Sequence, residues 1–403
     1  MNTKKTSSKT QSFSIKRDSQ LESLLNSEHV VNIEKLAVGG AGVSRIIFKD
    51  KNLVCFVPKS VPGDLIKIKV TFIEKNYLVG EILEVLNPGL GRRTAPCKHF
   101  DDCGGCPWQH IEETVQVEQK ELILNDLFKK FLPTQSYQLS KTVTDSHAFE
   151  YRNRIQLKQI GQKIGFFKPD THDLVDIDDC LIAEPDIRKW FKENKFKLKP
   201  ADKLKKFELK INSENKIDFY PIGVKNTGLS FSQVNRYINE KLVNATFELL
   251  KPHDFKNITE FYAGSGNFTF KLAELHEKTH IDAVELSSDL TKIAVKEIQN
   301  RKLQKKIRFY TTKSEYFPIK NKLSDQLIFI DPPRQGCEPL LIKSIAQAGP
   351  KFILYISCHP VSLVRDLALL TKLDYHFKIN HLQIFDMFPQ TDHFETLCLI
   401  EKV

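Results

Sequence analysis

The sequence predicts an α/β protein in which a C-terminal parallel sheet is preceded by a small β-barrel and a cysteine-rich central region. Three observations support this fold class. Strand-like and helical segments alternate over residues 229–403, short period-two runs fill residues 29–87, and a cysteine cluster lies between them. Strand–helix alternation is typical of parallel sheets with helices on both faces, whereas short runs divided by turn residues are typical of barrels. The 403 residues are enough for two or three domains.

Residues 1–28 are expected to form a disordered basic leader. This stretch is polar and rich in Lys, Ser and Thr, and it lacks the apolar core of a signal peptide. No run in the chain approaches the length of a membrane span, so the sequence indicates a cytoplasmic protein without a membrane partner. The formal net charge of +10 favours a polyanionic partner such as nucleic acid. A generally basic soluble surface is the simpler interpretation.

Residues 29–87 predict a five-stranded, OB-like barrel. The runs VVNIEKL, RIIFKD, NLVCFV, LIKIKVTFI and YLVGEILEV are separated by turn residues. Lys67, Lys69 and Lys75, with the arginines at positions 92 and 93 nearby, are expected to form a basic face. Barrels of this size hold nucleic acid in such a groove, although a solvated strand face would have the same composition.

Residues 88–228 form the expected central domain, which opens with a cysteine cluster. Cys97, Cys103 and Cys106 have the spacing C-x(5)-C-x(2)-C, and Cys180 lies downstream. Disulfides are not expected in a reducing compartment. Four thiolates can hold zinc or an iron–sulfur cluster, and spacing alone does not distinguish the two. Because such a metal would tie together the chain between the cysteines, its expected role is structural.

The remainder of the central region predicts one helix and several strands. Apolar residues recur at helical spacing over residues 111–131, and this helix is expected to pack on a neighbouring domain. Strand-like runs follow at residues 151–160, 162–168 and 174–180, before a Lys-rich passage at residues 192–216.

Residues 229–403 carry a nucleotide-type binding pattern. The strand-like run NITEFYA ends in a glycine turn at residues 264–267, and Glu285 follows about twenty residues later, where an acid can bind ribose hydroxyls. Only two of the three glycines of the dinucleotide fingerprint are present. That fingerprint serves a pyrophosphate, which S-adenosylmethionine lacks, so the turn favours a methyl donor over NAD.

Three further side chains lie at the ends of strands of the same expected sheet. Asp331 ends the run LIFI and is held away from helix by the prolines after it, Cys358 ends the run KFILYIS, and Glu395 precedes the last apolar run. A lone cysteine is usually core filling, and a carboxylate in Glu395's position often caps a loop. Because ligands bind at the carboxyl ends of parallel strands, however, the three residues and the glycine turn together predict a reactive site.

Several motifs resemble those of the RNA uracil-5-methyltransferases, particularly the 23S rRNA branch that has a TRAM barrel and an iron–sulfur domain. The central matches are FYAGSGNFTF, IDPPRQG, YISCHP and DMFPQTDHFET. GGAGVSR followed by FVPKSVPGD looks like a TRAM domain, and CGGCPWQH, YRNRIQL, GFFKPDTHDLVDIDDC and FSQVN also fit the family's pattern. The similarity extends over residues 29–403.

The resemblance implies a Rossmann-like, S-adenosylmethionine-dependent methyltransferase domain that acts on carbon 5 of a uridine in 23S rRNA. Cys358 would be the nucleophile that adds to carbon 6, and Glu395 the base that removes the proton from carbon 5. Contacts to the donor would come from Gln233, Tyr262, Asn267, Glu285 and Asp331. A [4Fe-4S] cluster would be held by Cys97, Cys103, Cys106 and Cys180.

Two positions depart from the family's pattern, and alternative functions stay open. Lys313 stands where the family often has Asn or Asp, and His359 replaces the asparagine that usually follows the nucleophile. The alternatives are the same reaction on a tRNA uridine, or a non-catalytic RNA-binding or assembly protein. Asp-Pro-Pro also occurs in amino-group methyltransferases, but these need no nucleophilic cysteine such as Cys358. The chain is expected to act as a monomer.

Overall fold

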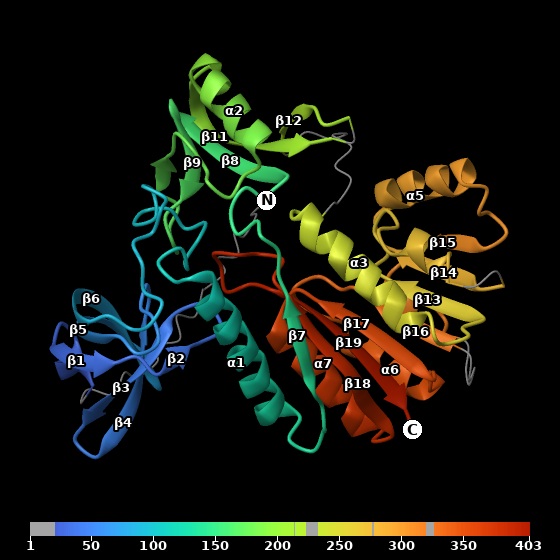
Figure 1. Ribbon diagram of the computed structural model, residues 1–403, viewed down its shortest axis with the longest axis horizontal. Coiled ribbons are helices and arrows are strands. Elements are labelled where there is room, and N and C mark those ends of the chain that lie inside the picture. Colours follow the sequence, from blue (N-terminus) through green and yellow to red (C-terminus); the bar gives the residue numbers. More distant parts are fainter. Residues whose placement is uncertain (1–20, 213, 223–232, 276–277, 320–325) are drawn as a thin grey trace, which may run out of the picture. The chain divides into compact units, whose positions relative to one another are not determined.

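The chain folds into two compact units, Met1–Arg92 and Arg93–Val403 (Figure 1). The computed structural model describes residues 21–212, 214–222, 233–275, 278–319 and 326–403. Most of the predicted leader therefore lies outside the described residues. None of the helices in these ranges is long and apolar enough to cross a bilayer.

The first unit is a six-stranded sheet with the strand order β1-β5-β6-β4-β3-β2. Its strands are β1 (Glu28–Asn32), β2 (Lys35–Leu36), β3 (Gly42–Phe48), β4 (Lys51–Val57), β5 (Leu65–Ile73) and β6 (Tyr77–Asn87). The run predicted as one first strand is split into β1 and β2, so the barrel has six strands and not five. Along β5, the buried Ile66, Ile68 and Val70 alternate with lysines, as expected of a half-buried strand.

Two details of this unit differ from the sequence-based expectation. Leu21 and Leu24, assigned to the leader, are buried in the barrel core around the short helix η1 (Glu22–Leu24). The predicted basic face is also weaker than expected, because Arg92 is committed to the buried Asp64, with Nε 2.9 Å from Oδ1. Lys67 likewise pairs with Glu28 at 2.7 Å.

The second unit is built on an eight-stranded sheet with the order β15-β14-β13-β16-β17-β19-β18-β7. Its strands are β7 (Leu139–Val143), β13 (Asn257–Phe261), β14 (His280–Glu285), β15 (Ile307–Thr311), β16 (Gln326–Ile330), β17 (Phe352–Ser357), β18 (Phe377–Phe385) and β19 (Glu395–Lys402). Strands β13 to β17 pair in parallel, as predicted, and β19 is inserted antiparallel between β17 and β18. The carboxyl ends of the parallel strands therefore meet at one edge.

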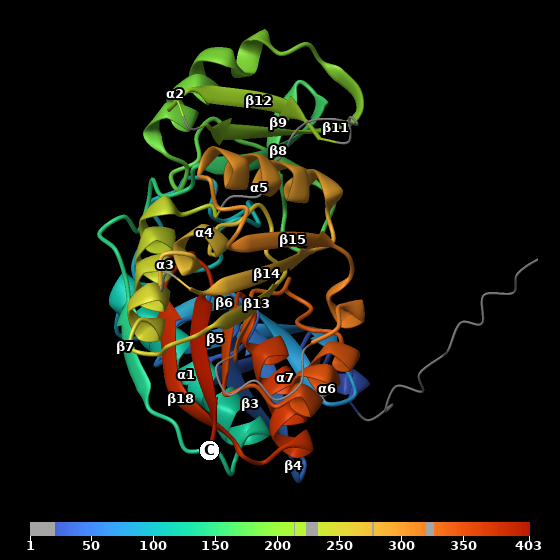
Figure 2. The same cartoon turned by 90° about the vertical axis from the view of Figure 1, so that its right-hand side faces the viewer.

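Helices pack on this sheet. One buried core joins the strands to α3 (Arg236–Leu250), α4 (Thr269–Leu272) and α5 (Ser288–Asn300). Helices α6 (Pro339–Ala348) and α7 (Pro360–Leu373) lie side by side (Figure 2). Helix α1 (Glu113–Phe131) contacts α7, which lies in the same compact unit.

A separate five-stranded antiparallel sheet has the order β10-β9-β8-β11-β12. Its strands are β8 (Arg154–Gly161), β9 (Lys163–Phe167), β10 (Leu174–Asp176), β11 (Ala201–Ile211) and β12 (Ile217–Pro221), and α2 (Pro185–Asn194) packs on them. Helix α1 and strand β7, which also fall within residues 88–228, lie with the large sheet and its helices.

Candidate functional site

A cavity of about 430 Å³ lies at the carboxyl ends of β13, β14, β16 and β17. All seven residues proposed from the sequence for catalysis and donor binding line it: Gln233, Tyr262, Asn267, Glu285, Asp331, Cys358 and Glu395. They come from six separate segments of the chain. The structure therefore brings the complete sequence-predicted set into one site.

The glycine turn after β13 has a backbone that few residues tolerate. Gly264 and Gly266 have φ angles of 58° and 98°, and a Cβ on Gly266 would lie 2.5 Å from the Phe270 ring. Tyr262 also has a positive φ of 62°, which is strained for a bulky side chain and typical of functional sites. The Glu285 carboxylate accepts hydrogen bonds from the backbone N–H of Gly264 at 2.9 Å. This hydrogen bond fixes Glu285 against the glycine turn.

Three carboxyl groups face the same cavity. Desolvation raises the pKa of Asp331 to about 7 and that of Glu260 to about 8. Burial, followed by the charge of Asp331, raises the pKa of Glu395 well above its usual value. Among the described residues, Glu260 Oε2 and Glu395 Oε2 have no hydrogen-bond partner. Such a concentration of unsatisfied carboxyls suits a cationic ligand.

Glu260 is a site residue that the sequence reasoning missed. It is 1% exposed and is the one charged residue in the otherwise uncharged strand β13 (NITEF). The sequence already contained a signal for this residue. An ionisable side chain within an apolar strand that leads into a glycine turn indicates a functional site.

Cys358 follows β17 and directly precedes the cap of α7. Burial raises the pKa of its thiol to about 12, with the Glu395 and Asp331 carboxylates adding to the shift and Arg334 opposing it. The thiol is therefore neutral at rest, and its activation needs proton transfer or additional positive charge. His359 caps α7, since its Nδ1 accepts from the Ser362 N–H at 3.4 Å. The imidazole thus takes a capping role that an asparagine side chain can also perform.

The loop that carries Asp331 and Arg334 is anchored from α7. Asp366, which is buried, accepts hydrogen bonds from the Cys337 N–H and the Tyr355 hydroxyl, both at 2.7 Å. At Gly336 a Cβ would lie 2.6 Å from Asp366 Oδ2. The loop is thus held against α7. Lys313, by contrast, is largely solvent-exposed and lies 3.8 Å from Glu315.

The four clustered cysteines line a second cavity of about 610 Å³. Cys97, Cys103 and Cys106 reach it from one segment and Cys180 from another, and all are free thiols. The turn at Gly104 is tied to β9 by a hydrogen bond from its N–H to the Phe167 carbonyl at 3.0 Å. Within the described ranges, no three His, Cys, Asp or Glu side chains are placed to hold a metal ion. The thiols surround a space and do not converge on one point.

The two cavities are adjacent. Arg154, Val234 and Arg334 line both of them. Arg334 follows β16 of the large sheet and Arg154 begins β8 of the five-stranded sheet. The cysteine-lined region therefore contributes to the wall of the site that contains Cys358.

Comparison with known proteins gives consistent matches. A family model described as tRNA (Uracil-5-)-methyltransferase matches residues 208–403, and a TRAM domain model matches residues 22–83. The chain is 37% identical over 380 residues to an uncharacterized RNA methyltransferase of Bdellovibrio bacteriovorus, covering 93% of this chain and 95% of that protein. It is 24% identical over 435 residues to the 23S rRNA (uracil(1939)-C(5))-methyltransferase RlmD of Vibrio campbellii, covering 94% and 97%.

A solved structure shares the fold. The tRNA (uracil-54, C5)-methyltransferase of Pyrococcus abyssi, in complex with S-adenosyl-L-homocysteine, superposes with a TM-score of 0.67 at 21% identity, covering 92% of this chain and 99% of that chain.

Proposed function

This chain belongs to the RNA uracil-5-methyltransferase family, whose methyl donor is S-adenosylmethionine, and from this premise we propose that it methylates carbon 5 of a uridine in 23S rRNA through a covalent bond to Cys358. The observation that carries the proposal is the single cavity lined by Cys358, Glu395 and the donor turn. A non-catalytic RNA-binding protein would have no need for this set of reactive groups.

The donor would lie over the glycine turn. Bound there, S-adenosylmethionine supplies a methyl group on a positively charged sulfur. We expect Glu285, which accepts a hydrogen bond from the Gly264 N–H of the turn, to bind the ribose hydroxyls. We expect Gln233, Tyr262 and Asn267, which line the same cavity, to contact the rest of the donor. Glu260 and Asp331 become anionic most readily next to a cation. Their carboxyl groups thus favour a cationic donor over a neutral one.

The thiol and the carboxyl have complementary tasks. The Cys358 thiol first loses its proton to water, and its sulfur then forms a bond to carbon 6 of uracil. The electrons of the ring double bond move toward the carbonyl oxygen, which makes carbon 5 nucleophilic enough to take the methyl group from the sulfonium and leave a neutral thioether. Glu395 then accepts the remaining proton from carbon 5. The electrons of that C–H bond re-form the ring double bond as the carbon–sulfur bond breaks. A carboxyl with a raised pKa is suited to receive this proton.

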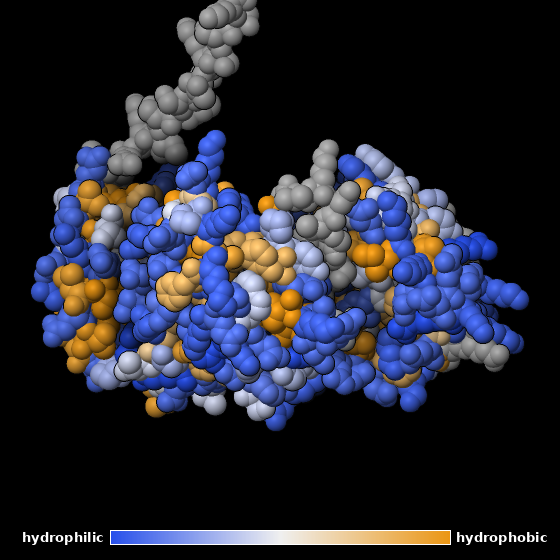
Figure 3. Space-filling view, turned by 90° about the horizontal axis from the view of Figure 1, so that it is seen from above, coloured by the Kyte–Doolittle hydropathy of each residue, from blue (hydrophilic) through white to orange (hydrophobic). Residues whose placement is uncertain are grey.

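The basic surface of the five-stranded sheet supports an RNA substrate. Figure 3, a view from above coloured by hydropathy, shows a largely hydrophilic face with several apolar patches. At the start of β11 the pairing with β8 is shifted between Ala201 and Lys205, and Lys203, Lys205 and Lys206 are exposed. Such irregularities re-aim side chains. Lysines exposed in this way can contact phosphates.

The choice of RNA is tested by mapping 5-methyluridine in a strain that lacks the gene. We expect nucleoside mass spectrometry to show the loss of 5-methyluridine from 23S rRNA, with restoration by the plasmid-borne gene. Loss from tRNA alone would instead establish the second candidate, which the fold shared with the Pyrococcus abyssi tRNA enzyme favours. An unchanged pattern in both RNAs would contradict the proposal.

We further propose that Cys97, Cys103, Cys106 and Cys180 hold a [4Fe-4S] cluster. The position of the four thiols supports this proposal, since they reach one cavity from two segments of the chain. A zinc ion would draw four sulfurs to about 2.3 Å from a single point, whereas a cluster spreads its four thiolates around a cube. Arg152 and Arg154 also line this cavity, and their positive charge can balance that of the thiolates.

Metal content can be read from the colour of the protein. Purified without oxygen, the wild type should be brown and absorb near ~400 nm, as cysteine-ligated iron–sulfur centres do. Cys103→Ala should lose this absorbance and its bound iron. The matched control is Cys55→Ala in the barrel core, which should keep both. A colourless wild type that contains zinc would contradict the cluster.

A further inference from the structure

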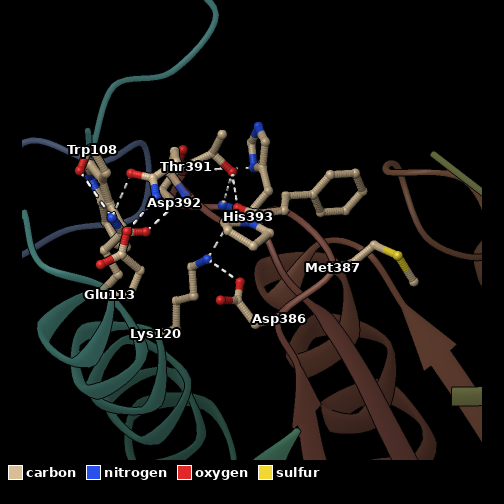
Figure 4. A network of polar contacts seen from close by, with 12 residues as sticks. Trp108, Glu113, Lys120, Asp386, Met387, Thr391, Asp392 and His393 are labelled. Atoms are coloured by element: carbon tan, nitrogen blue, oxygen red, sulfur yellow. Dashed lines mark hydrogen bonds and ion pairs between the residues drawn. The ribbon is translucent and has the colours of Figure 1, made fainter. Parts of the chain in front are cut away.

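The loop of residues 386–394, which joins β18 to Glu395, is held by hydrogen bonds from elsewhere in the chain (Figure 4). Four consecutive backbone carbonyls of this loop each accept a hydrogen bond from a different segment. The donors are Asn235 Nδ2 to Met387 at 3.2 Å, Lys120 Nζ to Phe388 at 3.2 Å, Tyr151 OH to Pro389 at 3.0 Å and the Trp108 N–H to Gln390 at 3.1 Å. None of these donors belongs to β18 or β19.

Helix α1 supplies the charged part of this contact. Glu113, Gln116 and Lys120 are spaced so that they lie on one face of the helix, and all three reach the loop. Lys120 Nζ is 2.6 Å from Asp386 Oδ1, and its side chain is 0% exposed. A fully buried ammonium must be paired and hydrogen-bonded. Lys120 is therefore restricted to this position beside Asp386.

Gln390 is fixed in an unusual conformation by the same contacts. It is fully buried and has a φ of 69°, in the left-handed region that non-glycine residues rarely adopt. Its N–H donates to Gln116 Oε1 at 2.8 Å, and its side-chain amide donates to Glu113 Oε1 at 2.8 Å. Such a conformation persists only where the surroundings over-determine it.

The contacts to the loop matter because few contacts orient Glu395, the proposed base. Glu395 is 2% exposed, and among the described residues its Oε2 accepts no hydrogen bond. Glu395 begins β19 opposite Phe385 of β18, so the direction of the carboxyl is set by the backbone of that strand end and of the loop before it. Phe388, whose carbonyl Lys120 holds, lines the cavity together with Glu395. Cys358, by contrast, is not preceded by this loop: it follows β17, whose last residue Ser357 pairs with Thr396 of β19.

We propose that Lys120, together with Tyr151 and the other donors to this loop, positions Glu395 for removal of the proton from carbon 5. The inference rests on the proposed function and deepens it. It separates two steps of the reaction: the loop contacts serve the release of the methylated base, whereas thiol addition depends on Cys358 and its own strand. Disturbing the contacts should therefore trap the enzyme on its RNA.

Two variants test this. In Lys120→Met/Asp386→Leu both charges are replaced by apolar groups, so that no buried charge is left unpaired. Tyr151→Phe removes only the hydroxyl that donates to Pro389. The matched control is Lys402→Met, which removes an ion pair to Asp374 at the far end of the β18–β19 pair. Each variant is incubated with substrate RNA containing ordinary uridine and S-adenosylmethionine, and adduct and product are measured separately.

We expect the double variant to release methylated RNA about 10²-fold more slowly, since small misplacements of a catalytic group cost this much. The RNA adduct that survives denaturing gel electrophoresis should meanwhile accumulate. Tyr151→Phe should show the same pattern with a smaller, severalfold change, and it carries the test if the double variant does not fold. The control should behave like the wild type.

Two results would overturn the inference. One is product release at the wild-type rate in both variants. The other is a parallel fall of adduct and product in variants that still unfold cooperatively, because the loop would then serve RNA binding or thiol addition. A wild type that forms neither adduct nor product would instead refute the proposed function, so the two failures are distinguishable.

Discussion

Replacing Cys358 by alanine is expected to abolish covalent attachment to RNA and to lower methyl transfer by about 10⁴-fold or more, the scale seen when a nucleophile is removed from a catalytic unit. The physical reason is that carbon 5 of uracil is too weak a nucleophile without the bond to sulfur. RNA carrying 5-fluorouridine makes the measurement direct. A base can remove hydrogen from carbon 5 as a proton, but it cannot remove fluorine in this way. The wild-type adduct should therefore persist on a denaturing gel.

The control for this experiment is another buried cysteine of the same sheet. Cys398→Ala, in β19, should retain the adduct and its yield. An adduct that still forms with Cys358→Ala would show that another group attacks the ring. Binding of the fluorinated RNA, measured without the donor, should be similar in both variants.

The same thiol predicts a pH dependence. Burial, assisted by the Glu395 and Asp331 carboxylates, raises the pKa of Cys358 to about 12, and the attacking species is the thiolate. The fraction of thiolate therefore grows with pH throughout the neutral range. Adduct formation in the wild type should accelerate from about pH 6 to about pH 9. A rate that falls over this window would contradict a thiol that is neutral at rest.

Replacing Glu395 by glutamine is expected to stop the reaction one step later. The amide has nearly the shape of the carboxyl but cannot accept the proton from carbon 5, so turnover should fall by about 10²- to 10⁴-fold. Thiol addition and methyl transfer should still take place. RNA with ordinary uridine should then stay attached to the enzyme and carry the methyl group, which mass spectrometry of the digested adduct would detect. Normal turnover in this variant would exclude Glu395 as the base.

A stability measurement controls for misfolding of this variant. The folded-state pKa of Glu395 is raised by burial, so the protonated carboxyl is compatible with folding at low pH and its ionisation opposes folding as the pH rises. Glutamine does not ionise. Glu395→Gln should therefore be as stable as the wild type in acid and more stable at alkaline pH, in thermal unfolding followed by circular dichroism. Lower stability at every pH would point to a structural role.

The fold class and most of the active cavity could be predicted from the sequence. Alternating strands and helices predict a parallel sheet, and a residue placed directly after such a strand must reach the carboxyl edge. The sequence predicts this position for Asp331 and Cys358, and the structure brings both to the cavity that Glu395 also lines. Local periodicity is sufficient to place these residues because it identifies the strands, and all parallel strands end at the same edge of the sheet.

Other features were decided only by tertiary structure. The basic face expected of the barrel is reduced because Arg92 forms an ion pair with Asp64, which is distant in the sequence. Strand β7 joins the large sheet by pairing with β18, which no local pattern indicates. Whether a polar side chain is a ligand contact, an ion pair or a support depends on which remote segment lies opposite it. The sequence alone therefore identified Glu395 as a candidate base, whereas only the folded chain shows that Lys120, on a distant helix, holds the loop that leads into Glu395.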